Sequence, residues 1–99
     1  MAELIVIFWR NIPAQVVVRA GRRNAKRELP PRFQAAIDEA AMRADARDTE
    51  AYLAEWRRAA PIPCGEDLET EADAAASRLD AEYDPARVAR LVAAGGRAE

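Results

Sequence analysis

Apolar residues in the first part of the chain fall into two runs separated by a short turn. The runs cover residues 4–9 and 14–19, and both are rich in β-branched side chains, which favour strands. Asn11-Ile12-Pro13 lies between them and has the residue types of a tight connection. The pattern predicts an antiparallel hairpin. Because every position from 4 to 9 is apolar, both faces of this strand are apolar, which is typical of a strand at the centre of a sheet.

Three later stretches carry apolar residues at the three- and four-residue spacing of amphipathic helices. They cover about residues 31–44, residues 66–83, and a segment from Asp84-Pro85 to Gly95-Gly96. Asp followed by Pro is typical of a helix start, and Gly is typical of a helix end. We therefore predict three helices, and the first is expected to pack on one face of the hairpin.

Two segments are expected to lie outside regular structure. Residues 20–28 contain Gly21 and are dominated by charged side chains, so they are expected to form a loop or a frayed strand end. Residues 61–65, Pro-Ile-Pro-Cys-Gly, are expected to interrupt any helix or strand.

Residues 51–60 fit two descriptions. Tyr52, Leu53 and Trp56 have the spacing of a helix that Thr49 would cap. A sheet of only two strands would be marginally stable, however, and a third strand beside the hairpin would relieve this. We predict a short third strand near residues 52–59. The fold class is then α+β, with one domain over residues 1–99, a small antiparallel sheet and helices packed on one of its faces.

Charge is distributed unevenly along the chain. The net charge is −2 and histidine is absent, but residues 1–34 have a balance of +5 and residues 35–99 a balance of −7. Cys64 is the single cysteine, which favours a reducing compartment. The first apolar run is far shorter than the roughly 20 residues of a membrane span and has no signal-peptide flanks. We expect a cytoplasmic protein that does not enter a membrane.

Two groups of residues are candidates for binding. The basic run from Arg19 to Arg27 could hold phosphate, carboxylate or an acidic protein surface, or could be a solvated loop that keeps a strand end soluble. Two Trp-Arg pairs would form one aromatic and cationic surface if their strands were neighbours, unless both tryptophans belong to the core. The candidate anion- or partner-binding residues are Arg10, Arg19, Arg22, Arg23, Lys26, Arg27, Trp56 and Arg57.

Catalytic, metal and cofactor sites are not expected. The absence of histidine removes the commonest general base and the commonest transition-metal ligand. Cys64 has acidic neighbours, which oppose formation of a thiolate. Nucleic-acid binding is disfavoured because the rest of the chain is acidic and no aromatic residues interleave with the basic run.

A set of short motifs carries a family resemblance. The motifs are Phe8-Trp9-Arg10, Ile12-Pro13-Ala14-Gln15-Val16, Lys26-Arg27-Glu28-Leu29, Arg32-Phe33, Ala36-Ile37-Asp38, Ala41-Met42-Arg43, Tyr52-Leu53 and Trp56-Arg57. In this order they resemble the short alphaproteobacterial form of a small bacterial family described as virulence factor, closely over residues 3–60 and loosely beyond. The resemblance implies an accessory role beside corrinoid- and tetrahydrofolate-dependent methyl-transfer enzymes. The family supplies no catalytic residues to carry over.

These observations lead to one expected function and two alternatives. We expect a non-enzymatic accessory or partner-binding protein, with a methyl-transfer enzyme as the partner that the resemblance implies. The first alternative is a protein that binds a small anionic ligand, either a folate or a phosphorylated cofactor. The second is a nucleic-acid-binding regulator. The identity of the partner or ligand and the oligomeric state stay open at this point.

Overall fold

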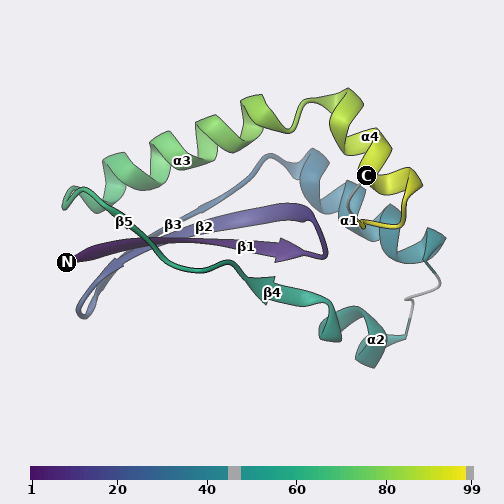
Figure 1. The fold of residues 1–99 in the computed structure, drawn as a ribbon, viewed down its shortest axis with the longest axis horizontal. Helices are drawn as coiled ribbons and strands as arrows, with labels where there is room; N and C mark the ends of the chain where they lie inside the picture. The colour runs from purple at the N-terminus through teal and green to yellow at the C-terminus, as the bar shows by residue number, and fades with distance from the viewer. Residues whose placement is uncertain (45–47, 98–99) are drawn as a thin grey trace.

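Strands and helices alternate in groups along the described part of the chain, which is residues 1–44 and 48–97 of a computed structural model (Figure 1). In chain order the elements are β1 (Ala2–Trp9), β2 (Ile12–Ala20), β3 (Arg23–Glu28), α1 (Pro31–Arg43), α2 (Thr49–Ala54), β4 (Trp56–Arg58), β5 (Ile62–Cys64), α3 (Leu68–Glu82) and α4 (Pro85–Ala93). The antiparallel sheet with helices confirms the predicted α+β class.

The sheet is built around β1, as its two apolar faces predict. Strand β2 pairs with one edge of β1, and β3 pairs with the outer edge of β2. The other edge of β1 pairs with β5 near its start and with β4 near its end. The strand order is β3-β2-β1-β4, and every pairing is antiparallel. The predicted hairpin of β1 and β2 is confirmed.

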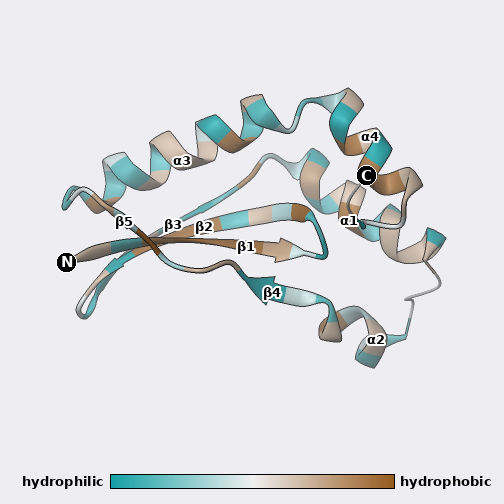
Figure 2. Ribbon diagram, in the orientation of Figure 1, coloured by the Kyte–Doolittle hydropathy of each residue, from teal (hydrophilic) through white to brown (hydrophobic). Residues whose placement is uncertain are grey.

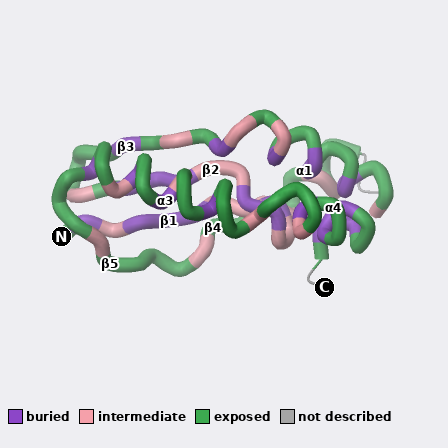
Figure 3. Tube along the Cα trace, turned by 90° about the horizontal axis from the view of Figure 1, so that it is seen from above, coloured by how far each residue is buried: buried purple, intermediate pink, exposed green. Residues whose placement is uncertain are grey.

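The helix α3 covers one face of this sheet (Figure 1). The sheet contributes alternate residues such as Leu4 and Val18 to the core, and α3 contributes Leu68, Ala72 and Leu79. Two alanines of α3, Ala72 and Ala75, are almost fully buried, and such small side chains leave room for the helix to lie close to the strands. Figure 2 shows β1 as a nearly continuous apolar strand, and Figure 3 shows the buried positions of β1 and β2 lying near α3.

The three predicted helices are present, and their starts follow the expected chemistry. Asp84 caps α4, where its carboxylate accepts a hydrogen bond from the backbone N–H of Arg87 at 2.8 Å. Asp67 caps α3 in the same way by accepting from the N–H of Thr70. The first helix, α1, packs mainly on α4 and less on β2, so α3 takes most of the sheet face that we expected α1 to cover.

The prediction of a loop or frayed strand end for residues 20–28 is corrected by the structure, in which residues 23–28 form β3. Gly21 has a φ of +60°, so the chain reverses tightly and returns along the edge of β2. Ala25 is buried on the α3 side, while its polar neighbours Asn24 and Lys26 are exposed. The weak strand propensity of this segment is overcome by a full ladder of pairs with β2. Its charges also suit an edge strand.

The prediction that residues 61–65 interrupt regular structure is also corrected, because residues 62–64 form β5. Two prolines in this stretch led us to expect a break. Pro63 is tolerated because β5 pairs through one edge only, with β1, and an edge strand can accept a residue that lacks an N–H.

Residues 51–60, which fitted both a helix and a strand, divide between the two. Residues 49–54 form α2, and its cap is Asp48 rather than Thr49, since the Asp48 carboxylate accepts from the N–H of Ala51 at 2.8 Å. Residues 56–58 then form β4 beside β1. The predicted third strand is confirmed in a shorter form, and the helical reading was right for the residues before it.

The turn that follows α4 packs against the last residue of β1, Trp9. Trp9 is fully buried, and its Nε1–H donates to the carbonyl oxygen of Tyr52 at 2.9 Å while the two rings stack at 5.8 Å. Gly96 has a φ of +87°, and a Cβ atom there would lie 2.9 Å from Cζ3 of Trp9. Only glycine fits this position without strain, so the turn after α4 can lie directly on the tryptophan.

We predict that Gly96→Ala destabilises the protein by about 2–4 kcal/mol, because it combines left-handed backbone strain with overpacking against Trp9. Gly21→Ala is the matched control. Gly21 also has a positive φ, but nothing lies within 4 Å of a Cβ added there, so the expected cost is only about 1 kcal/mol. Urea unfolding of both variants measures the difference, and equal losses would show that Gly96 does not contact Trp9.

Candidate functional site

The two predicted Trp-Arg pairs lie side by side, but they do not form one exposed surface. Trp9 and Trp56 are register partners in β1 and β4, so the strands are neighbours as the prediction required. Trp9 belongs to the core, whereas Trp56 is half-buried and meets the Tyr52 ring edge-on at 6.0 Å. Of the two tryptophans, only Trp56 is available to a partner.

Arg10 holds the C-terminal turn in place. Its side chain is 11% exposed, and its Nη1 donates to the carbonyl oxygen of Gly95 at 2.8 Å. Its Nη2 lies 3.3 Å from the Glu55 carboxylate, and the guanidinium lies 5.0 Å from the centre of the Trp9 ring. These internal contacts leave little of Arg10 for a ligand.

Arg57 is also used within the chain. Its Nε donates to the carbonyl oxygen of Arg10 at 2.9 Å, and its Nη2 donates to Oδ1 of Asn11 at 3.1 Å. The guanidinium lies 4.6 Å from the centre of the Phe8 ring. Arg57 therefore fastens β4 to the β1–β2 turn, although it is exposed enough to touch a partner.

The basic run does not stay together. Arg27 points toward α3, where its guanidinium pairs with Glu69 and with Asp73. The hydrogen bond to Glu69 and then that to Asp73 raise the pKa of Arg27 above its ordinary value. Arg19 lies 3.6 Å from the Glu3 carboxylate. Both residues thus have acidic partners within the chain.

Three members of the basic run are left exposed. Arg22, Arg23 and Lys26 make no ion pair with the described residues. Arg22 and Arg23 lie in and beside the turn that joins β2 to β3, whereas Lys26 lies in the middle of β3, opposite Val17. We call Arg22 and Arg23 the basic hairpin. Arg23 acts weakly on Asp67, whose pKa is lowered mainly by its hydrogen bonds with Thr70. The basic hairpin is a cationic projection at the end of the sheet remote from α1 (Figure 1).

The face of the sheet opposite α3 is the second candidate surface. Figure 1 shows α3 along one face, and no described helix runs along the other. The register places Ile5, Ile7 and Val17 in the middle of this face. Around them lie Glu3, Gln15, Arg19, Asn24, Lys26, Glu28 and Arg58. We call this surface the open face.

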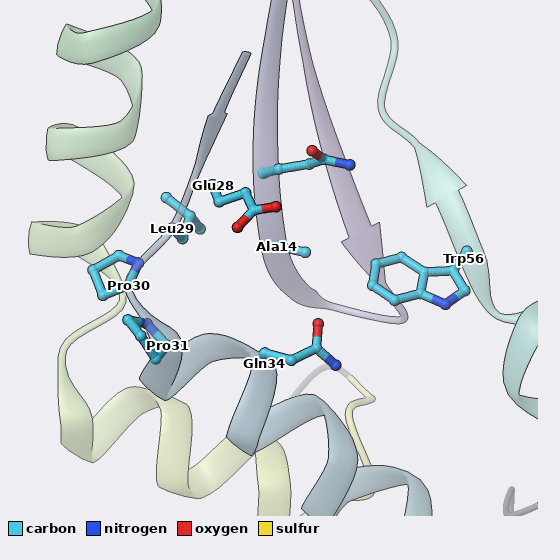
Figure 4. Close-up of a pocket in the computed structure, with 8 residues that line it drawn as sticks. Ala14, Glu28, Leu29, Pro30, Pro31, Gln34 and Trp56 are labelled. Carbon is cyan, nitrogen blue, oxygen red and sulfur yellow. The ribbon is translucent and has the colours of Figure 1, made fainter.

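A hollow of about 750 Å³ lies where the open face meets the start of α1. In Figure 4 the carboxylate of Glu28, the amide of Gln34 and the ring of Trp56 border the same space. Basic side chains are absent from its lining, so a phosphate or carboxylate would meet no counter-charge there. A smaller hollow adjoins it and shares Gln15 and Trp56. Trp56 and Arg57 of these linings were sequence candidates, whereas Gln15, Glu28, Gln34 and Arg58 were missed. Only the alternation of strand β2 could have indicated Gln15.

The thiol of Cys64 is not activated as a nucleophile. Burial is the largest effect on Cys64 and raises the pKa of its thiol, and the carboxylates of Glu71, Glu66 and Glu3 raise it further. The thiol therefore stays protonated near neutral pH, in contrast to a nucleophilic cysteine. Within residues 1–44 and 48–97, no cluster of acidic, Cys or His side chains could hold a metal ion.

One further finding concerns membranes. Among the described helices, none combines the length and the apolar character needed to cross a bilayer.

Comparison with known proteins identifies a family. The model of a family described as virulence factor matches residues 7–92. This range includes every element from β2 to α3 in full, the last three residues of β1 and all but the last residue of α4. No curated protein and no solved structure matches the chain.

Proposed function

The chain belongs to the virulence-factor family, and we propose that it is a non-enzymatic accessory protein that binds an acidic surface of a protein partner through its basic hairpin. The observation that carries this proposal is that Arg22 and Arg23, and also Lys26 on β3, form no ion pair with any described residue. Asp67 lies near Arg23 but interacts with it only weakly. Every other basic residue among the sequence candidates is held by the chain itself.

Charge favours a protein partner that approaches in one orientation. The chain as a whole is acidic, with a net charge of −2, so an acidic partner is repelled by most of its surface and attracted at one end. Such complementarity steers encounter and selects the partner more than it adds affinity. Nucleic acid fits less well, because the basic hairpin has no aromatic side chain on which a base could stack.

The family resemblance supplies the proposed partner class. It suggests a cytoplasmic enzyme of one-carbon metabolism that transfers methyl groups with a corrinoid or tetrahydrofolate. A non-enzymatic role agrees with the protonated Cys64 thiol and with a chain that contains no histidine. Binding of the folate itself has less support, because the large hollow beside Trp56 has an acidic residue and no basic residue in its lining.

We predict that Arg22→Glu with Arg23→Glu weakens capture of the partner about tenfold or more and leaves the fold unchanged. Both side chains are exposed, surface changes cost little stability, and reversed charges would repel an acidic partner. The measurement is capture by tagged chain from a lysate of the source organism, with the partner identified by mass spectrometry. Raised salt should reduce capture by the wild-type chain in the same way.

The matched control is Arg43→Glu with Arg78→Glu, which changes the net charge equally at exposed helix positions. Arg43 pairs with Glu39, but both side chains are more than half exposed, so loss of this pair costs little stability. Arg27 is left intact, because its reversal would place a carboxylate against Glu69 and Asp73. If both double variants capture the same partner equally well, the basic hairpin is not the contact. Turnover of a methyl-transfer or hydrolysis substrate by the isolated chain would contradict the non-enzymatic role.

A further inference from the structure

The charges of the open face are arranged in rows that cross the strands. One row runs Glu28, Gln15, Ile7, Arg58 from β3 to β4. A second runs Lys26, Val17, Ile5, and a third runs Asn24, Arg19, Glu3, Pro63. In the first row an acidic residue stands at one edge and a basic residue at the other. In the third row the two central residues have opposite charge.

These rows are self-complementary under one particular rotation. A two-fold axis that runs parallel to the strands, between β1 and β2, would place one open face on that of a second copy. The rotation brings Glu28 opposite Arg58 of the second copy, and Arg19 opposite its Glu3. The central pair Val17 and Ile5 then faces the same pair in reverse order. We propose that the open face is the interface of a homodimer with this symmetry.

The two residues at the ends of the first row support a second copy as the occupant. Glu28 and Arg58 are both exposed, and neither makes an ion pair with any described residue. They stand at opposite edges of the four-stranded part of the sheet, so they cannot pair with each other in one chain. Each would gain a partner of opposite charge in the dimer, and a two-fold axis would form both pairs at once.

The other in-plane axis is less favourable. A two-fold axis perpendicular to the strands would place the first row on the third. Ile7 would then face the Glu3 carboxylate of the second copy, and Arg19 would face the uncharged Gln15. Because a carboxylate over an apolar side chain loses hydration without gaining a counter-charge, charge selects the axis parallel to the strands.

The chemistry of the face predicts a weak dimer. Ile5 is only 2% exposed and Val17 8%, so they form a recessed floor and the contact is made largely by the polar side chains around them. Four strands spaced about 4.8 Å apart, over about five residues, give a face of roughly 20 by 15 Å. The area of such a face, about 300 Å², is well below the roughly 800 Å² per partner of a standard interface. The dimer should therefore be reversible and sensitive to salt.

This inference does not depend on the proposed function. Arg22 lies in the turn beyond the third row and Arg23 is the first residue of β3, so both lie outside the residues that the two open faces bring together. A dimer would therefore present two basic hairpins, and the experiments on the two surfaces have separate readouts. Lys26 lies in the second row, for which reason it is left unchanged in the variants that test partner capture.

The first experiment follows the wild-type chain by sedimentation velocity as its concentration rises. A reversible dimer should appear, and salt should raise its dissociation constant. In parallel, the methyl signals of Ile7 and Val17 should shift with concentration, while that of Ile37, which lies in the core, should not. A chain that is monomeric up to about 1 mM, a concentration that would half-populate even a millimolar dimer, would overturn the proposal.

The second experiment exchanges charges. Glu28→Arg and Arg58→Glu should each raise the dissociation constant at least tenfold, because each creates two like-charge pairs across the axis. When the two variants are mixed, both pairs again have opposite charges, and the heterodimer should form with about the wild-type affinity. Folding is checked by circular dichroism, and the methyl shifts of the wild-type chain test the same face without any substitution.

Matched controls lie on α3, which covers the other face of the sheet. Glu82→Arg and Arg78→Glu make the same charge changes at exposed positions and should leave the dimer unchanged. The proposal is overturned if these variants dissociate the dimer as strongly, or if the mixture of Glu28→Arg and Arg58→Glu stays monomeric. A dimer that is insensitive to Glu28 and Arg58 would also place the interface elsewhere.

Discussion

Val6→Asp should unfold the protein. Val6 lies on the α3 side of the central strand, directly opposite Val16 of β2, and it is only 9% exposed. A carboxylate there would lie among apolar side chains without a partner, at a cost of several kcal/mol. Because a domain of this size is stabilised by only about 5–15 kcal/mol, we expect loss of the cooperative thermal transition in circular dichroism.

Ile62→Asp is the control for this change. It introduces the same carboxylate in place of a β-branched side chain, but Ile62 on β5 is 55% exposed. The charge there keeps its hydration, so the cost should stay below about 1 kcal/mol. A Val6→Asp protein with native circular dichroism and the melting temperature of the Ile62 variant would show that β1 is not buried under α3.

Trp9→Ala should cost about 3–5 kcal/mol, the range for truncating a large aromatic side chain in a core. The indole is fully buried, stacks on Tyr52 and donates to its carbonyl oxygen. Its loss would also remove the surface on which Gly96 rests. Urea unfolding followed by circular dichroism measures the loss of stability.

The second tryptophan separates the core role from the surface role. Trp56 is half-buried and contacts Tyr52 through one ring edge, so Trp56→Ala should cost only about 1–2 kcal/mol. In the Trp56→Ala chain, Trp9 is the remaining tryptophan, and its fluorescence emission should be that of an indole shielded from water. Unfolding should shift this emission to longer wavelength. Equal costs for the two substitutions would contradict the assignment of Trp9 to the core and Trp56 to the surface.

The candidate site was predictable only in part. The sequence singled out the basic run as a group, yet the structure turns Arg27 toward the carboxylates of α3 and leaves Arg22 and Arg23 exposed. The acidic residues that capture Arg27 lie more than forty positions further along the chain. Nothing in the local pattern indicates such a pairing, because it depends on where α3 crosses the sheet.

The open face was indicated only by strand β2, where Gln15 and Arg19 share a face with Val17. On β1, Ile5 and Ile7 are as apolar as the residues on the core face, so this strand indicates two buried faces. Which face receives α3 is decided by the packing of Leu68 and its neighbours on Leu4 and Val18. The rows of opposite charge appear only once the register of four strands is known.

The sequence by itself determined the elements whose signals are local. The hairpin of β1 and β2, the three long helices and the Asp84 cap follow from spacing, propensity and capping, which act between residues close in the chain. Only the tertiary structure decided that residues 23–28 and 62–64 become strands and which face of the sheet stays open. It also decided that one tryptophan is core and the other is not. These outcomes depend on hydrogen bonds and burial between distant segments, and no local pattern encodes them.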